Sequence, residues 1–118
     1  MYSQGEIVLI PVPFSDLSAS KKRPVLVISN SSYNATSQDI IVIAVTSNIT
    51  QLGIPITTDD LTRGVLPKPS VIRSDKIYTL HQDIVVKRIG RIADGILEMV
   101  RTDTIRYISS DTSESEKH

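Results

Sequence analysis

Arg23 stands where a polar, basic stretch of the chain meets an almost continuous apolar one, in the segment KKRPVLVI over residues 21–28. Pro24 fixes its own backbone φ angle and pushes the residue before it toward an extended conformation. Arg23 should therefore be held in a defined direction at the start of a buried strand. Because a planar guanidinium can donate two parallel hydrogen bonds, this arrangement suits a phosphate group. The alternative is an arginine in an ordinary surface ion pair.

Arg73 and Asp75 form a second set of candidate residues, in the segment SVIRSDKIYTL over residues 70–80. Residues two apart in a strand project from the same face, so a cation and a carboxylate should lie side by side. In a functional interpretation, this cation and this carboxylate lie together next to a bound phosphodiester. In the simpler alternative it is a surface ion pair that contributes about 0 to 1 kcal/mol to stability.

Thr46 and Ser47 are candidate hydroxyl groups, because they follow an apolar run at the point where a strand should give way to a polar turn. A strand end that faces solvent suits a reactive hydroxyl or a phosphate contact, although threonine is also common in strands and serine in turns. His81 is the one histidine outside the C-terminal tail. A lone histidine in a turn is more often a surface residue than a proton shuttle.

Metal and cofactor chemistry find little support in the sequence. The chain has no cysteine, no closely spaced pair of histidines, and no Walker loop, dinucleotide-binding fingerprint or nucleophile elbow. We therefore expect no metal site, no cofactor and no disulfide framework.

Six β-rich segments should position these residues. They cover residues 6–12, 24–28, 39–45, 53–57, 70–80 and 85–92. Pro55 cannot donate to a β-ladder, so its segment is expected at an edge or a bulge, and segment 70–80 is expected to bend at Ser74 and Asp75. Loops are predicted over residues 15–22 and 30–37, and one helical turn within residues 58–64.

The hydrophobic period changes near the C-terminal end of the chain. A helix is predicted over about residues 95–108, with Asp94 as its N-cap. Its core face should hold Ile96, Leu97, Val100, Ile105 and Ile108. Short strands followed by one helix predict a mainly β fold, a small and strongly curved barrel.

Segments 24–28 and 39–45 are apolar on both faces, so one face can fill the barrel while the other needs a cover. The terminal helix can cover part of it. A second copy of the chain can cover the rest, which predicts a homodimer.

Length and charge set further limits. With 118 residues, the chain can form one domain, predicted over residues 1–108, while the polar residues 109–118 are expected to be disordered. The net charge of zero argues against a general nucleic-acid coat protein. However, the tail from Asp111 holds three acids and one lysine, so the body before it has twelve basic and ten acidic residues. No stretch is long and apolar enough for a membrane helix, and the N-terminus lacks a basic secretory start. We expect a cytoplasmic protein with no membrane partner.

Several of these segments, taken in order, resemble the MazF/PemK (Kid) family, the toxin half of type II toxin–antitoxin systems. The resemblance runs through GEIVLIP (5–11), PFSD (13–16), KRPVLVI (22–28), IIVIAVTS (40–47) and PSVIRSDKI (69–77) to Gly90 and the terminal helix. It covers nearly the whole chain to about Ile108.

The resemblance implies an SH3-like barrel of the CcdB/PemK type that acts as a homodimer. The implied activity is sequence-specific endoribonuclease cleavage of single-stranded RNA, mostly messenger RNA. Catalytic roles pass to Arg23, Thr46, Arg73 and Asp75. Some family members use a histidine in the first loop, but residues 15–22 contain none, so no histidine role is transferred.

Such a reaction needs no metal, because RNA carries its own nucleophile, the 2′-hydroxyl. Arg23 would stabilise the phosphorane and assist the leaving group, and Arg73 would hold the phosphate and could also act as an acid. Either Asp75 or Thr46 would position or deprotonate the 2′-hydroxyl, to give a 2′,3′-cyclic phosphate and a 5′-hydroxyl. The other candidate RNA contacts are Lys21, Lys22, Ser47, Lys68 and Lys76.

The same cationic surface would suit a cognate antitoxin, an acidic and partly disordered protein that folds on binding. Two other functions stay open on the sequence. One is a gyrase-binding toxin of the CcdB branch, although that branch uses bulky C-terminal residues that this tail lacks. The other is a non-catalytic SH3-like binding module, although one Phe and four Tyr offer little for an aromatic-lined groove.

Overall fold

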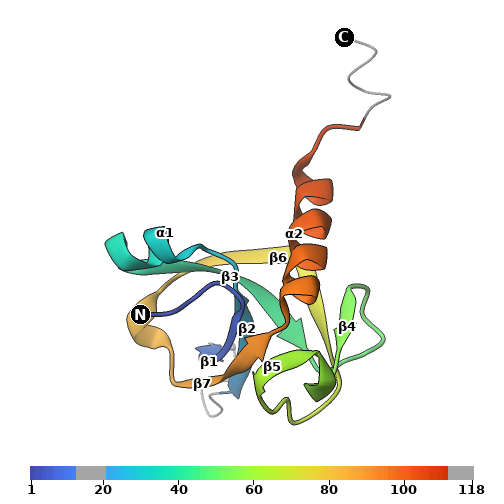
Figure 1. Ribbon diagram of the computed structural model, residues 1–118, viewed down its shortest axis with the longest axis horizontal. Helices are drawn as coiled ribbons and strands as arrows, with labels where there is room; N and C mark the ends of the chain where they lie inside the picture. Colours follow the sequence, from blue (N-terminus) through green and yellow to red (C-terminus); the bar gives the residue numbers. More distant parts are fainter. Residues whose placement is uncertain (13–20, 112–118) are drawn as a thin grey trace.

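A computed structural model describes residues 1–12 and 21–111 of the protein. Seven strands form one curled antiparallel sheet in the order β4-β6-β3-β2-β1-β7-β5, and a helix follows the last strand (Figure 1). The strands are β1 (Glu6–Val12), β2 (Lys21–Val27), β3 (Asp39–Thr46), β4 (Ile54–Ile56), β5 (Leu61–Gly64), β6 (Ser70–His81) and β7 (Lys87–Ile92). The helices are α1 (Ser31–Thr36) and α2 (Asp94–Ile108), with 3-10 turns η1 (Thr58–Asp60) and η2 (Gln82–Ile84). The expected mainly β fold with a C-terminal helix is confirmed.

Strand β6 bends at the predicted place. Ile43 of β3 pairs with Ile77, but the next residue, Ala44, pairs with Arg73, so residues 74–76 form a bulge. A bulge bends its strand and re-aims the side chains that it carries. Strand β4 ends the sheet order, so the edge position expected from Pro55 is also confirmed.

Three local predictions are corrected. The segment expected as a loop over residues 30–37 contains α1, which Asn30 caps by accepting a hydrogen bond from the Tyr33 backbone N–H at 2.9 Å. Asp94 is the first residue of α2 and not its N-cap; the cap is Ala93, whose N–H is bonded to the carbonyl of Asp60. Residues 58–64 hold the expected turn as η1, but then continue as β5 because they pair with β7.

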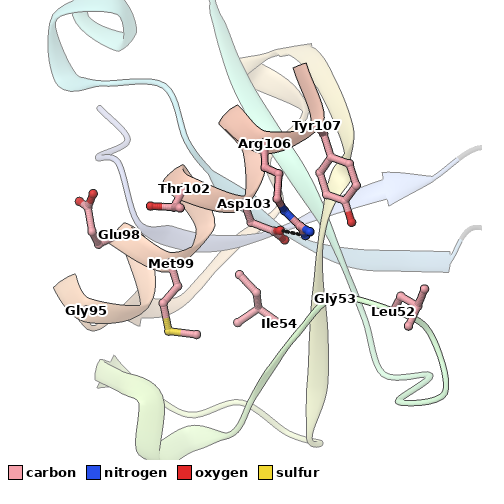
Figure 2. Close-up of a pocket in the computed structure, with 10 residues that line it drawn as sticks. All are labelled: Leu52, Gly53, Ile54, Gly95, Glu98, Met99, Thr102, Asp103, Arg106 and Tyr107. Atoms are coloured by element: carbon pink, nitrogen blue, oxygen red, sulfur yellow. Dashed lines mark hydrogen bonds and ion pairs between the residues drawn. The ribbon is translucent and has the colours of Figure 1, made fainter. Parts of the chain in front are cut away.

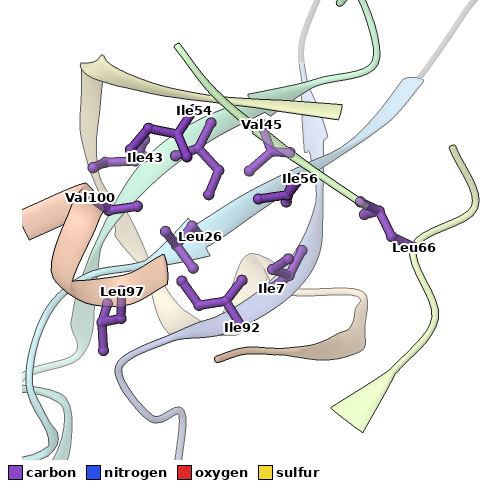
Figure 3. Close-up of a cluster of buried hydrophobic side chains, with 11 residues drawn as sticks. Ile7, Leu26, Ile43, Val45, Ile54, Ile56, Leu66, Ile92, Leu97 and Val100 are labelled. Atoms are coloured by element: carbon purple, nitrogen blue, oxygen red, sulfur yellow. The ribbon is translucent and has the colours of Figure 1, made fainter. Parts of the chain in front are cut away.

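Two apolar clusters pack on opposite faces of the central strands. The first lies under α2 (Figure 3) and contains Ile7, Leu26, Ile43, Val45, Ile54, Ile56, Leu66, Ile72, Ile92, Leu97 and Val100. The second contains Val8, Ile10, Val25, Val27, Ile40 and Val42, and is covered by Tyr2, Leu80 and Val85. The second face of β2 and β3, for which the sequence suggested another copy as cover, is therefore buried within this chain.

Helix α2 buries only its first half. Leu97 and Val100 are buried, but Ile105 is 53% exposed and Ile108 is 73% exposed. The helix runs beyond the sheet that supports it (Figure 1). The prediction that Ile105 and Ile108 join the core is wrong for this reason.

The predicted loop over residues 15–22 and the predicted tail over residues 109–118 lie mostly outside the described residues. The last two residues of the loop are described, and they begin β2. In the tail, residues 112–118 lie outside the described part of the chain. Neither helix of the described part of the chain is long and apolar enough to cross a bilayer.

Candidate active site

Strands β2, β3 and β6 are neighbours and bring the candidate residues to one face of the sheet. Ala44 pairs with Val25 on one side and with Arg73 on the other, and directly opposed residues share a face. Arg23 lies two residues before Val25 and Thr46 two residues after Ala44, so both project from that same face. If the β2–β3 register continues by two residues, Arg23 lies opposite Thr46.

The Arg73 guanidinium is held by two side chains. Its Nε and Nη2 donate to Oδ1 and Oδ2 of Asp75, each at 3.2 Å, and its Nη1 donates to the side-chain oxygen of Gln51. The side chains of Arg73 and Asp75 are 19% and 37% exposed. Within the described residues, these bonds use three of the five N–H groups of Arg73, so two can still serve a ligand.

Gln51 was not found by sequence reasoning. It lies in the turn between β3 and β4, five residues after Thr46. The sequence offered only one indication that Gln51 belongs to the site, its closeness to Thr46 along the chain. The hydrogen bond between Gln51 and Arg73 depends on how the turn folds back over strand β6, which the sequence does not reveal.

The charge state of Asp75 is set mainly by Arg73. The hydrogen bond from Arg73 lowers the pKa of the Asp75 carboxyl, partial burial opposes this effect, and the charges of Arg73 and Lys76 add to the lowering. Asp75 is therefore ionised at neutral pH, and it is a weaker base than an ordinary aspartate as long as Arg73 holds it.

We expect Asp75 to titrate below the ordinary value of 3.8, and the substitution Arg73→Gln to move its midpoint back toward that value. Because the pKa is lowered in the folded state, the pair stabilises the fold above the ordinary pKa, and this contribution is lost as the pH falls through the lowered value. Carboxyl NMR chemical shifts of the two proteins against pH measure both midpoints. An equal midpoint in parent and variant would show that Arg73 does not control Asp75.

The Thr46 hydroxyl is oriented by the turn that follows it. Its oxygen accepts the backbone N–H of Asn48 at 3.1 Å, and the Asn48 side chain in turn accepts from the N–H and hydroxyl of Thr50. These bonds leave the hydroxyl hydrogen of Thr46 as a donor. The arrangement suits a hydrogen bond to phosphate better than it suits proton abstraction.

The basic residues of the prediction are spread along the same strands. Lys21, Lys22 and Arg23 are exposed at the start of β2, where Arg23 pairs with Ile10 of β1. Lys76 lies in the β6 bulge beside Asp75, and Ser47 is exposed directly after Thr46. Lys68 precedes β6, and within the described residues no hydrogen bond or ion pair links it to the other candidates.

His81 lies away from these groups. It pairs with Asp39 at the start of β3, whereas Thr46 at the end of β3 pairs with Val71. Seven residues of strand span roughly 23 Å. The Nδ1 atom of His81 accepts the Asp83 N–H at 3.1 Å and so caps η2. In the described ranges, no three His, Cys, Asp or Glu side chains gather closely enough to hold a metal ion.

A separate groove of about 900 Å³ lies between α2 and the segment that leads into β4 (Figure 2). Its walls include Leu52, Met99 and Tyr107. Within the groove, Nη2 of Arg106 forms an ion pair with Oδ1 of Asp103 at 2.5 Å. None of the residues predicted to act on phosphate lines this groove. The candidate active site is therefore the β2–β3–β6 face.

Known proteins resemble this chain in both sequence and structure. Endoribonuclease MazF2 of Mycobacterium bovis and endoribonuclease MazF6 of Mycobacterium tuberculosis are each 33% identical to it over 95 residues, which cover 75% of this chain and 79% of the relative. The solved MazE–MazF (Form-II) from Deinococcus radiodurans has a TM-score of 0.74 at 19% identity and covers 93% of this chain and 97% of that one. An endoribonuclease in complex with its cognate antitoxin from a mycobacterial species has a TM-score of 0.70 at 16% identity, with 89% and 90% coverage.

The structural likenesses confirm the expected fold class, and the sequence matches confirm the resemblance on which the expected activity rests. The protein family described as "PemK-like, MazF-like toxin of type II toxin-antitoxin system" matches this chain over residues 3–108, which is most of its length. The chain therefore belongs to the PemK/MazF family of endoribonuclease toxins of type II toxin–antitoxin systems.

Proposed function

We propose that this chain is a sequence-specific endoribonuclease that cleaves single-stranded RNA, mostly messenger RNA, by attack of a 2′-hydroxyl on the adjacent phosphate. The observation that carries the proposal is the alignment of Arg23, Thr46 and the Arg73–Asp75 pair on one face of three neighbouring strands. Together they supply cations, a hydrogen-bond donor and a carboxylate. RNA transesterification needs these groups and no metal ion.

Arg23 and Arg73 bind the non-bridging oxygens of the scissile phosphate and stabilise the charge of the phosphorane. Thr46 donates a hydrogen bond to the same phosphate. Asp75 accepts the proton of the 2′-hydroxyl. In the free protein, the hydrogen bond from Arg73 lowers the pKa of Asp75 and makes it a weaker base. When the phosphate binds, it competes with Asp75 for the Arg73 guanidinium. This competition returns the pKa of Asp75 toward its ordinary value.

The reaction is a transesterification, in which one phosphorus–oxygen bond replaces another. The 2′-oxygen bonds to phosphorus while the bond to the 5′-oxygen breaks, and the 5′-oxygen takes a proton from solvent. Arginine is a poor proton donor, since its pKa exceeds about 12, so Arg23 assists the leaving oxygen through its charge. The products are a 2′,3′-cyclic phosphate and a 5′-hydroxyl.

One 2′-deoxynucleotide placed at the cleaved linkage will reduce cleavage to background, because it removes the nucleophile. The measurement uses purified protein and matched oligonucleotides in EDTA, with the fragment ends identified by mass spectrometry. The control oligonucleotide carries the 2′-deoxynucleotide two positions away and should be cut normally. Cleavage of the first oligonucleotide, 5′-phosphate ends, or loss of all activity in EDTA would each contradict the mechanism.

The proposed partner is a cognate antitoxin, an acidic and partly disordered polypeptide. Two solved relatives of the same fold are complexes with an antitoxin or with MazE. An acidic segment laid on the cationic β2–β3–β6 face would exclude RNA phosphates from it. Since messenger RNA is the proposed substrate, we place the activity in the cytoplasm.

A homodimer is also proposed, and the exposed half of α2 is its expected interface. Ile105, Tyr107 and Ile108 are all at least half exposed there, and Met99, in the first half of the helix, is also half exposed. Charged residues at an apolar contact oppose association. We expect the parent to have twice the 13.0 kDa monomer mass in light scattering, and Ile105→Lys to shift it toward the monomer.

The matched control for the dimer is Ser32→Lys on α1, an exposed position away from α2. It should leave the mass of the parent unchanged. A parent that is monomeric at micromolar concentration, or an Ile105→Lys variant that stays dimeric, would contradict this interface.

A further inference from the structure

All five arginines that lie on strands project from one face of the sheet. Arg63 of β5 pairs with Arg91 of β7, and Arg91 pairs with Glu6 of β1. Glu6, Val8 and Ile10 alternate onto one face of β1, where Val8 pairs with Arg88 and Ile10 pairs with Arg23. Arg73 shares that face through Ala44 and Val25. The arginines thus follow the sheet from the candidate active site to the β5 edge.

The β5–β7 edge holds an arrangement that stability does not explain. Arg63 and Arg91 are directly opposed, and like charges in this position destabilise a sheet by up to about 1 kcal/mol. The charge of Arg91 is balanced by an ion pair between its Nη1 and Oδ1 of Asp94 at 3.3 Å. Arg63 is exposed, and its side chain has no hydrogen bond or ion pair with any other described residue.

A hollow lies beside this arginine pair. It measures about 280 Å³ and its walls include Arg63 and Arg88, with the buried carboxylate of Glu6 neutralised by Arg88 at 3.3 Å. Gly64 and Gly90 oppose each other in its wall, and a Cβ atom on either would overlap a carbonyl oxygen of the other strand. The close approach of the two strands therefore requires glycine at both positions, and this part of the wall is backbone.

We propose that this β5–β7 edge is a second phosphate-binding site, which holds the RNA backbone several nucleotides away from the cleaved linkage. This inference rests on the proposed function. Three strand spacings and four residues of strand separate Arg23 from Arg63, on the order of 20 Å along the sheet. An oligonucleotide that spans only the cleaved linkage cannot reach so far, whereas a longer strand can.

An acidic polypeptide is the other chemistry that could neutralise these arginines. RNA is favoured because the edge shares its face with Arg23 and Arg73, so one backbone that passes around the cover of Tyr2, Leu80 and Val85 can contact all three. A guanidinium also matches the paired oxygens of a phosphate. The test therefore includes an acidic peptide as a competing ligand.

The test compares Arg63→Gln with Arg101→Gln, an exposed arginine on α2 outside the proposed dimer contact and over the other face of the sheet. With a 20-nucleotide RNA, Arg63→Gln should raise KM about three- to tenfold and leave kcat within twofold. With a minimal oligonucleotide the two variants should be equal to the parent. Between 50 and 200 mM salt, the advantage of the parent over Arg63→Gln should shrink about 2.5-fold, as expected for one phosphate contact on a single strand. Arg63→Lys should recover part of the affinity.

Binding of a fully 2′-deoxy 20-mer, which cannot be cleaved, separates this inference from the proposed function. If the parent binds the 20-mer, Arg63→Gln weakens that binding and no RNA is cut, the second site stands and the enzymatic proposal fails. If RNA is cut and Arg63→Gln behaves as Arg101→Gln does at both lengths, the second site is overturned. An Arg63→Gln variant that loses affinity for a glutamate-rich peptide but not for the 20-mer also overturns it.

Discussion

Replacement of Arg23 by alanine will slow RNA cleavage by about 10²- to 10³-fold, a loss of roughly 3 to 4 kcal/mol of transition-state stabilisation. The cause is the removal of a guanidinium near the start of β2, on the face that carries Thr46 and Arg73. That cation acts mainly on charge that develops in the phosphorane, so kcat should fall more than KM rises. Single-turnover cleavage of a matched oligonucleotide gives the rate directly.

Two further variants sharpen the result for Arg23. Arg23→Lys keeps the charge but not the planar fork, so it should fall between the parent and Arg23→Ala. Arg101→Ala on α2 is the control for a lost arginine outside the site and should cut at the parental rate. Circular dichroism and thermal unfolding should show all variants folded, because Arg23 is exposed. A folded Arg23→Ala protein with parental activity would remove Arg23 from the mechanism.

Replacement of Arg88 by alanine will lower the free energy of unfolding by about 3 to 5 kcal/mol, because it strips the cation from a buried carboxylate. The Glu6 side chain is 3% exposed, and Arg88 contacts both of its carboxylate oxygens at 3.3 Å. Arg88 also donates to the Met1 carbonyl at 3.0 Å and lies over the Tyr2 ring at 4.5 Å. Urea unfolding monitored by circular dichroism measures the loss.

The double variant Glu6→Gln/Arg88→Ala is the control for the buried charge. It should be more stable than Arg88→Ala alone, because the amide is neutral and can keep the hydrogen bond that the Ser3 N–H now gives to Glu6 at 2.7 Å. A double variant no more stable than the single one would show that the packing of Arg88, and not its charge, matters at this position.

The strands were predictable because their signals are local. Runs of β-branched residues placed β1 and β3 to within a residue, and Pro55 placed β4 at an edge. The loop expected over residues 30–37 was wrong because Asn30 and its serine neighbours serve turns and helix caps alike. Periodicity identified the inner face of α2, but it carries no information on where the sheet beneath the helix ends.

The candidate site was predictable only where its groups are close in sequence. The Arg73–Asp75 pair follows from a spacing of two residues, and the structure has it as an ion pair. The contact from Gln51 and the opposition of Arg63 and Arg91 depend on turn geometry and strand register. Register is set by long-range packing and by bulges, which a single sequence does not reveal.

Strands β2 and β3 have tightly packed side chains on both sides, so their backbones have little freedom to shift. The turn over residues 47–53 is different: it is solvent-exposed, yet Asn48 orients the Thr46 hydroxyl and Gln51 holds Arg73. Exchange of the other residues of this turn between relatives can therefore retune which nucleotides are accepted, while Asn48 and Gln51 keep the reacting groups in place. Directed evolution of altered cleavage specificity should begin with a library confined to the positions of this turn other than Asn48 and Gln51.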